Sequence, residues 1–197
     1  MTFAADFETT TDAKNCRVWA WGMLSMDGEE FVFGTQLHEL FEYCEYYKTL
    51  TLYYHNLKFD GQFMLDWLFK HGYEFCHSTE INEYGERSRR KLEPGQFTTS
   101  ISDMGIFYLI EICLPNGSRV TVKNSVNLIP MELEAIPAAF GLPTQKLSID
   151  YDLPRGEDYM ITQDEAEYLR RDCEILRNAL RLLRDMGMKR MTTSSNA

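Results

Sequence analysis

Apolar and polar residues alternate in short runs over the first part of the chain, as expected for strands joined by turns. Residues 3–8 and 17–24 are each mainly apolar and bounded by polar residues, and each predicts a strand. Asp27-Gly28 is a hairpin signal, and residues 30–33 predict the returning strand. This region therefore predicts three strands, two of them joined in a hairpin.

The middle of the chain changes between helical and strand patterns. Apolar residues at helical spacing predict helices over 37–47 and from Phe59 to Gly72. The apolar run 50–54 between them predicts a buried strand. Residues 77–97 are polar and irregular, which predicts a loop or a loose hairpin.

A second hairpin follows. Residues 106–114 and 119–122 flank Asn116-Gly117, a turn signal between two strand patterns. We expect a short helix over 131–140. Residues 142–160 contain prolines and glycine and predict an irregular but structured loop.

The final helix has the clearest pattern. Thr162 and Glu165 have the spacing of a capping box, and Gly187 ends the helical periodicity. One apolar stripe is formed by Ala166, Leu169, Cys173, Leu176, Leu180 and Leu183. Strands and helices in this mixed order predict an α/β domain around a mixed sheet.

Composition narrows the class of protein. The chain has 197 residues, of which 44% are hydrophobic and 25% charged, which is typical of one globular domain. No apolar run approaches the roughly 20 residues needed to span a bilayer, so we expect no membrane association. The five cysteines are odd in number and never spaced Cys-x-x-Cys, which argues against a disulfide framework and favours a reducing, cytoplasmic setting.

The charge balance does not predict duplex binding. The net charge is −10, whereas phosphate binding needs clustered basic residues. One dense basic cluster, at Arg87, Arg89, Arg90 and Lys91, fits a solvated loop equally well. An excess of carboxylates could also serve to hold metal ions, which composition alone does not decide.

Two acidic residues lie at the end of the first predicted strand. Asp6 and Glu8 are two residues apart, so their side chains leave the same face of the strand. Alone, this spacing is also common on solvated strand faces. The apolar residues 3–5 that precede them predict instead that both acids stand at the end of a buried strand.

Two further acidic residues lie on predicted helices. Asp60 opens a helix directly after a buried strand, so it is either an N-terminal cap or a ligand. Asp172 lies one turn after Tyr168, close to the buried side of its helix. A buried carboxylate needs a partner, either a cation or one of the neighbouring arginines.

If the four acids converge at one sheet edge, they form a site of hard oxygen ligands. Such a site suits Mg²⁺ or Mn²⁺ better than zinc. Two such ions are the usual machinery for displacement at phosphorus. Tyr168 would orient the attacking water, since its ordinary pKa near 10 makes it a poor base.

Three segments together resemble a known family. Residues 6–10, 55–60 and 168–172 are similar to the three exonuclease motifs of family B DNA polymerases, most closely those of the protein-primed phage polymerases of the phi29 type. Residues 16–20 and 149–151 also resemble that group. The resemblance covers essentially the whole chain, and three motifs in order are more specific than any one.

The resemblance implies a ribonuclease H-like fold and 3′→5′ proofreading on single-stranded DNA. It implies two divalent cations, Mg²⁺ or Mn²⁺, held by Asp6, Glu8, Asp60 and Asp172. Tyr168 matches the tyrosine that positions the water, which makes this the tyrosine variant (DEDDy) of the fold. Lys146 matches a lysine that contacts the scissile phosphate, although it would also fit a solvated loop.

The resemblance also implies contacts with the DNA strand. The matching positions are Thr9, His55, Asn56, Phe59, Phe63, Ser125, Val126 and Tyr151. Phe59 and Phe63 could stack on bases or pack in the core. His55 could contact DNA or be hydrogen-bonded within the fold. Val126 departs from the leucine that is usual in the family.

The resemblance sets the expected domain organisation and partners. Residues 1–191 are expected to form the exonuclease domain, and 192–197 a linker or truncated junction to an absent polymerase domain. The implied partners are a single-stranded DNA 3′ end, a polymerase domain in cis and a terminal priming protein, in the cytoplasm of a phage host. The alternatives are a free-standing exonuclease and a non-catalytic module that binds single-stranded DNA or the priming protein.

Overall fold

A computed structural model describes residues 1–12, 14–81, 87–156 and 158–188. The expected junction at 192–197 lies outside these residues. The strands are β1 (Thr2–Thr9), β2 (Val18–Ser25), β3 (Phe31–Gly34), β4 (Thr49–Tyr54), β5 (Glu74–Phe75), β6 (Thr79–Ile81), β7 (Arg87–Arg89), β8 (Gln96–Ile101), β9 (Phe107–Cys113) and β10 (Arg119–Asn124). The α-helices are α1 (Leu37–Cys44), α2 (Leu57–Lys70), α3 (Ile136–Phe140) and α4 (Gln163–Asp185).

The described strands form one mixed sheet and a small separate hairpin, β6–β7. The order in the large sheet is β3-β2-β1-β4-β10-β9-β8-β5. β4 runs parallel to both β1 and β10, while the outer pairs β1–β2 and β9–β10 are antiparallel. The carboxyl ends of β1, β4 and β10 therefore meet at one edge of the sheet, the position where α/β folds bind ligands.

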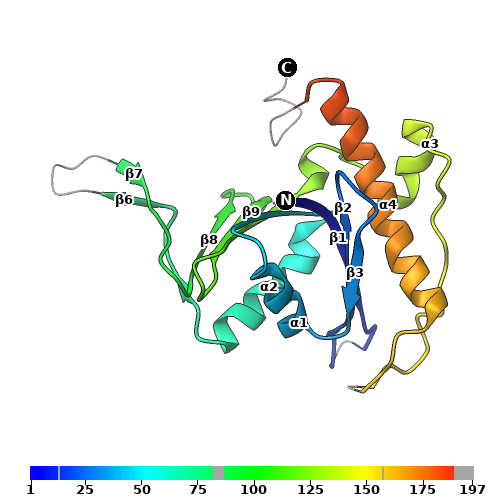
Figure 1. The fold of residues 1–197 in the computed structure, drawn as a ribbon, viewed down its shortest axis with the longest axis horizontal. Helices are drawn as coiled ribbons and strands as arrows, with labels where there is room; N and C mark the ends of the chain where they lie inside the picture. The colour runs from blue at the N-terminus through cyan, green and yellow to red at the C-terminus, as the bar shows by residue number, and fades with distance from the viewer. Residues whose placement is uncertain (13, 82–86, 157, 189–197) are drawn as a thin grey trace.

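Helices cover both faces of the sheet around β1. In Figure 1, α1 and α2 lie on one side of strands β1 to β3, and α3 and α4 lie on the other. One face of β1 packs in the core shared with α1 and α2, through Phe3, Ala5 and Phe7. Ala4 points the other way and packs against α4 with Ile175 and Leu176. Because side chains alternate along a strand, Asp6 and Glu8 continue the row that faces α4.

Most of the predicted elements are confirmed. The strands over 3–8, 17–24, 30–33 and 50–54, both hairpins, and the loose hairpin within 77–97 are present. The final helix begins at a capping box formed by Thr162 and Glu165. Residues 142–160 contain no helix or strand among those described, as expected.

Several predicted boundaries were wrong. The helix expected over 131–140 is reduced to α3, preceded by a 3₁₀ turn at Leu133–Ala135. Pro137 lies in the first turn of α3, where its missing N–H costs nothing, and a longer helix would have placed it in the interior. α1 ends at Cys44 instead of residue 47, and α2 begins at Leu57 instead of Phe59.

Two strands were missed, the short β5 and β8. β8 (Gln96–Ile101) pairs with β9 on one side and with β5 on the other. Its sequence contains three consecutive hydroxyl residues and therefore lacks the apolar alternation of a strand. Pairing with β9 holds it in place, so a tertiary contact overrides the local pattern. None of the helices in the described ranges has the combination of length and apolar character needed to cross a membrane.

We predict that Gly22→Ala destabilises the protein. A Cβ at Gly22, on β2, would lie 2.7 Å from Leu169 Cγ and 2.9 Å from Leu169 Cδ2, so α4 would have to move. Overpacking of this kind costs about 1–3 kcal/mol in the free energy of unfolding. Urea unfolding monitored by circular dichroism measures it.

Gly28→Ala is the matched control, because its nearest contact would be an ordinary 3.6 Å to Ser25 Oγ. Equal stability of both variants and the parent protein would contradict this account of how β2 and α4 pack.

Candidate active site

A polar cleft of about 320 Å³ lies at the edge where β1 and β4 end. It brings together most of the side chains predicted from the sequence: Asp6, Glu8, Thr9, His55, Asn56, Phe59, Asp60, Lys146, Tyr151, Tyr168 and Asp172. Phe63, Ser125 and Val126, which were also predicted, do not line it. The predicted side chains that do line the cleft come from four separate segments of the chain, so only the tertiary fold brings them together.

Three carboxylates form the centre of the cleft. Asp6, Glu8 and Asp172 each have a carboxylate oxygen within 4.8 Å of the others. β1 places the first two on its α4-facing side, and α4 places Asp172 opposite them. Asp60 is buried in the first turn of α2 and lines the same cleft, although it is outside this close group.

Burial and mutual repulsion raise the pKa values of these acids. Burial, followed by the charge of Asp172, raises the pKa of Asp6 to about 8. Burial, followed by the charges of Asp6 and Asp172, raises the pKa of Glu8 to about 9. Burial also raises the pKa values of Asp60 and Asp172. The protein alone therefore does not compensate the negative charge that it gathers here.

These residues fit a site for divalent cations. The Oδ1 atom of Asp172 is buried and has no hydrogen-bond partner among the residues that the structure describes. An ionised oxygen of this kind is costly unless a cation or a proton meets it. Asp6 and Glu8 offer carboxylate oxygens close to it, and ligands of this kind suit Mg²⁺ or Mn²⁺.

Among the described residues, Lys146 is the cation that pairs with this group of carboxylates. Its Nζ lies 3.2 Å from Asp172 Oδ2 and 5.8 Å from the centre of the Tyr168 ring. The alternative that Asp172 pairs with a neighbouring arginine was wrong, because Arg170 pairs with Glu29 and Arg171 with acids of its own helix. Lys146 does not point away into solvent, as an ordinary loop lysine would.

Tyr168 is buried beside the carboxylates, and its hydroxyl group lies 2.6 Å from that of Tyr151. Burial, followed by the charges of Asp172 and Glu8, raises the pKa of Tyr168 far above its ordinary value of 10.0. The phenol therefore stays protonated at neutral pH. It can orient a water molecule by hydrogen bonding, and it cannot act as a base.

The start of α2 is built so that Asp60 is free to face the cleft. The N-cap residue is Asn56, not Asp60, so the capping alternative for Asp60 was wrong. Asn56 adopts a left-handed conformation with φ 69°, which is uncommon outside glycine, and its own side chain does not cap the helix. The Asn124 side chain instead accepts a hydrogen bond from the Leu57 backbone N–H at 3.2 Å.

Of the remaining residues predicted to contact DNA, some are exposed at the cleft and others are held within the fold. Phe59 is 44% exposed at the cleft, whereas Phe63 is partly buried against the core and contacts the Phe59 ring edge-on. His55 lines the cleft, yet both ring nitrogens are within hydrogen-bonding distance of groups in the fold, Ser125 Oγ at 2.9 Å and the Met131 carbonyl at 2.7 Å. Ser125 is fully buried.

Sequence reasoning missed some residues of the cleft. Thr11, Glu132 and Leu133 also line it, together with Phe7. Glu132 and Leu133 precede α3 and carry no motif, so only the folding of that segment over the sheet edge could reveal them. Thr11 directly follows the first motif, and its position in the loop after β1 was the available signal.

Sequence comparisons find similarity to DNA polymerases. A sequence model of the family described as DNA polymerase type B, organellar and viral, matches residues 44–197. The DNA polymerase of Bacillus phage Nf is 34% identical over 200 residues, an alignment that covers 99% of this chain and 32% of the phage protein. The chain therefore spans about a third of the length of such relatives.

Structural comparison finds the same similarity. The structure of phi29 DNA polymerase complexed with primer-template DNA superposes with a TM-score of 0.84 at 32% identity, covering 99% of this chain and 33% of the other. The structure of phi29 DNA polymerase complexed with single-stranded DNA gives the same TM-score, identity and coverage. The expected ribonuclease H-like fold, an α/β fold with a mixed sheet flanked by helices, is confirmed.

We predict that the metal-free protein loses stability as the pH rises. A carboxyl group whose pKa is raised by folding contributes stability that is complete below its unfolded-state pKa and is lost as the pH rises through its folded-state pKa. For Asp6 and Glu8 this window runs from the ordinary values of 3.8 and 4.5 to about 8 and about 9. The free energy of unfolding should therefore fall across this window.

Urea unfolding in EDTA and in Mg²⁺ or Mn²⁺ measures this effect. Either cation should restore stability, most at the alkaline end, because it compensates the ionised carboxylates. The variant Asp6→Asn/Glu8→Gln should flatten the pH dependence and remove most of the response to cations. An unchanged slope in this variant would show that other groups cause it.

Proposed function

Since the chain belongs to the type B DNA polymerases of organelles and viruses, we propose that it is the 3′→5′ proofreading exonuclease domain of a protein-primed DNA polymerase. It hydrolyses the terminal phosphodiester bond of a single-stranded DNA 3′ end. The observation that carries this proposal is the group of buried carboxylates, with Lys146 and Tyr168 beside them in one cleft.

Four carboxylates would hold two divalent cations, Mg²⁺ or Mn²⁺, in the cleft: Asp6, Glu8, Asp60 and Asp172. The bound ions would supply positive charge to the attacking and leaving oxygens of the reaction at phosphorus. Without cations, the ionised acids would repel the phosphate. Three of the four carboxylate side chains are already buried, so little reorganisation accompanies binding.

The other residues of the cleft would orient the reactants. Tyr168, held by the hydroxyl of Tyr151, would accept or donate a hydrogen bond to the attacking water. Lys146 would turn from Asp172 toward the scissile phosphate once cations neutralise that carboxylate. Water adds to phosphorus, the 3′ oxygen of the preceding nucleotide leaves and takes a proton, and a nucleoside monophosphate is released.

The single-stranded DNA would enter along the polar edge of the cleft. Phe59 presents an exposed ring on which a base could stack, and Asn56 and Thr9 lie beside it with hydrogen-bonding side chains. His55, Ser125, Val126 and Phe63 would support this surface. Of these, His55 and Ser125 act from within the hydrogen-bonded network described above.

The domain and its partners follow from the family. We infer that residues 1–191 form the exonuclease domain and that 192–197 join it to a polymerase domain in cis, since relatives of this chain are about three times as long. A solved structure shows phi29 DNA polymerase complexed with single-stranded DNA, which supports the same substrate here. A priming protein and the host cytoplasm as location complete the proposal.

We predict that the protein shortens a 5′-labelled single-stranded oligonucleotide from its 3′ end in Mg²⁺ or Mn²⁺ and not in EDTA. Asp6→Ala/Glu8→Ala should lower the rate by more than about 100-fold, because it removes two cation ligands. Gel analysis of the products measures it. Glu42→Ala/Glu45→Ala, which removes two exposed acids of the α1 region, is the control and should keep full activity.

A well-folded protein that binds the oligonucleotide and never cleaves it would refute the nuclease and favour a non-catalytic binding module. Cleavage that survives in Asp6→Ala/Glu8→Ala would show that the reaction occurs elsewhere or comes from a contaminant.

A further inference from the structure

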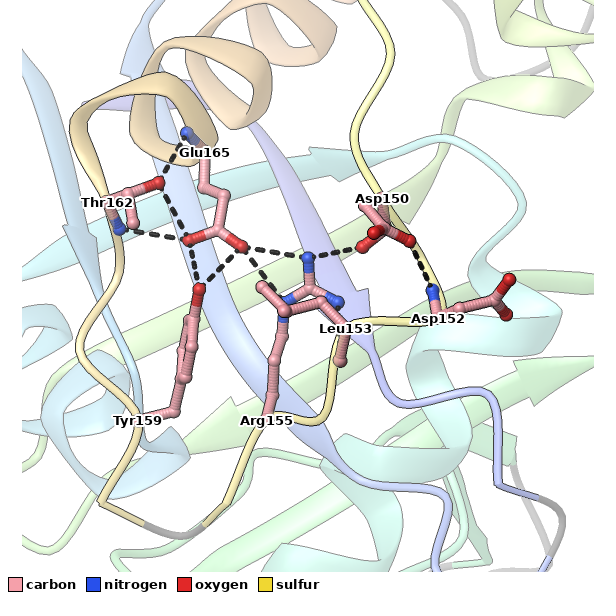
Figure 2. Close-up of polar contacts among 7 residues, drawn as sticks. All are labelled: Asp150, Asp152, Leu153, Arg155, Tyr159, Thr162 and Glu165. Carbon is pink, nitrogen blue, oxygen red and sulfur yellow. Dashed lines mark hydrogen bonds and ion pairs between the residues drawn. The ribbon is translucent and has the colours of Figure 1, made fainter.

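A buried ion pair lies outside the cleft, at the start of α4. Arg155 and Glu165 are 7% and 5% exposed. The Arg155 guanidinium donates two hydrogen bonds to Glu165 Oε1, from Nε at 3.0 Å and from Nη2 at 2.8 Å. Figure 2 shows the guanidinium between the Glu165 carboxylate and the backbone of the preceding loop. We propose that this pair positions Tyr151 and Lys146 in the cleft, an inference that rests on the proposed function.

Arg155 fixes the conformation of the loop that carries those two residues. Its Nη2 also donates to the Asp150 carbonyl at 2.8 Å, and its Nη1 donates to the Leu153 carbonyl at 3.3 Å. The guanidinium lies 4.1 Å from the centre of the Trp19 ring, on β2. One buried side chain thus links the loop, the sheet and α4.

The loop meets α4 at three successive levels. Glu165 receives Arg155 at the first turn of the helix, and Tyr168, three residues later, receives the Tyr151 hydroxyl group. Asp172, four residues further, receives Lys146. Spacings of three and four residues place all three acceptors on one face of the helix. The ion pair is therefore the outermost of three contacts, and the reacting groups occupy the inner two.

The inner two contacts are more open to solvent than the buried pair. Tyr151 is 45% exposed, and the segment 142–160 has no helix or strand among its described residues to restrain it. In each of these contacts the loop residue is partly exposed, Tyr151 at 45% and the Lys146 side chain at 31%, so water competes for it even though Tyr168 and Asp172 are buried. The buried pair is different, since both of its members are shielded from water and separating it would leave each charge in the protein interior without its counter-charge.

Glu165 has hydrogen-bond partners other than Arg155, so the start of α4 does not depend on Arg155 in the way that the loop does. Tyr159 donates to both of its carboxylate oxygens at 2.9 and 2.8 Å, and the Thr162 backbone N–H donates to Oε2 at 3.0 Å. Removal of the Arg155 guanidinium therefore leaves the capping box in place. We expect the loop to loosen while α4 stays formed.

A double-mutant cycle on the full chain tests the proposal. Arg155→Met keeps the apolar stem and removes the guanidinium, and it is introduced into the parent protein and into Lys146→Ala/Tyr151→Phe. In the parent we expect the single-turnover cleavage rate to fall about 10- to 100-fold, as for other residues that orient a reacting group. In the second background it should fall less than about 3-fold, because the groups that Arg155 positions are already gone.

Arg155→Lys and Arg184→Met are the companion variants. In Arg155→Lys the positive charge is kept, but one ammonium group cannot donate to both Glu165 and the loop carbonyls as the guanidinium does. We therefore expect a cleavage rate between those of Arg155→Met and the parent protein. Arg184 pairs with Asp27 at the far end of α4, with both side chains exposed, and its loss should change nothing. If Arg155→Met does not fold, the cycle is carried out with Arg155→Lys.

An equal fall in both backgrounds, or no fall in either, would overturn the proposal, since a merely structural role acts regardless of Lys146 and Tyr151. Amide hydrogen exchange gives a readout that does not depend on cleavage. Exchange over residues 144–153 should rise in Arg155→Met while that of 173–185 stays unchanged. If the parent protein proves inactive, the proposed function fails, and a rise in exchange confined to the loop still supports the positioning role. Unchanged exchange, or a rise throughout, refutes it.

Discussion

The contact between α4 and the central strands β1 and β2 is the constraint on which the rest of the molecule depends. Leu169 packs directly over Gly22, where even a Cβ would not fit at the present separation. This close approach brings the face of α4 that carries Asp172 against the face of β1 that carries Asp6 and Glu8. The carboxylates therefore meet because Leu169, about one turn from Asp172, packs α4 closely against the sheet.

This packing gathers negative charge that the apolar interactions must offset. Burial raises the pKa values of all four acids, and repulsion raises those of Asp6, Glu8 and Asp60 further. Within the described residues, Lys146 is the cation that pairs with this group, through Asp172. A site of this kind costs stability in the free protein and gains it when cations bind, as expected where function and folding make opposite demands. Regular elements, β1, α2 and α4, carry the acids, which suits a site that must hold its geometry under repulsion.

The groups that would act on the substrate are carried differently. Lys146 and Tyr151 lie on an irregular loop that contacts α4 at three levels and is anchored by the buried Arg155–Glu165 pair. A loop can adjust to an incoming strand in a way that a strand or helix cannot. The buried pair limits that freedom to the part of the loop that faces the cleft. The molecule thus combines carboxylates held on regular elements with more adjustable residues on the loop beside them.

The sequence alone determined the strands with alternating patterns, the long capped helix and the motif residues, since each depends on neighbours within a few positions. Tertiary structure alone decided that Asp172 pairs with Lys146 rather than with an arginine of its own helix, that Ser125 is buried, and that β8 joins the sheet. These outcomes depend on segments far apart in the chain, which no local periodicity records. The ion pair of Glu165 with Arg155 is likewise a result of the tertiary structure, whereas the role of Glu165 in the capping box could be predicted from the sequence.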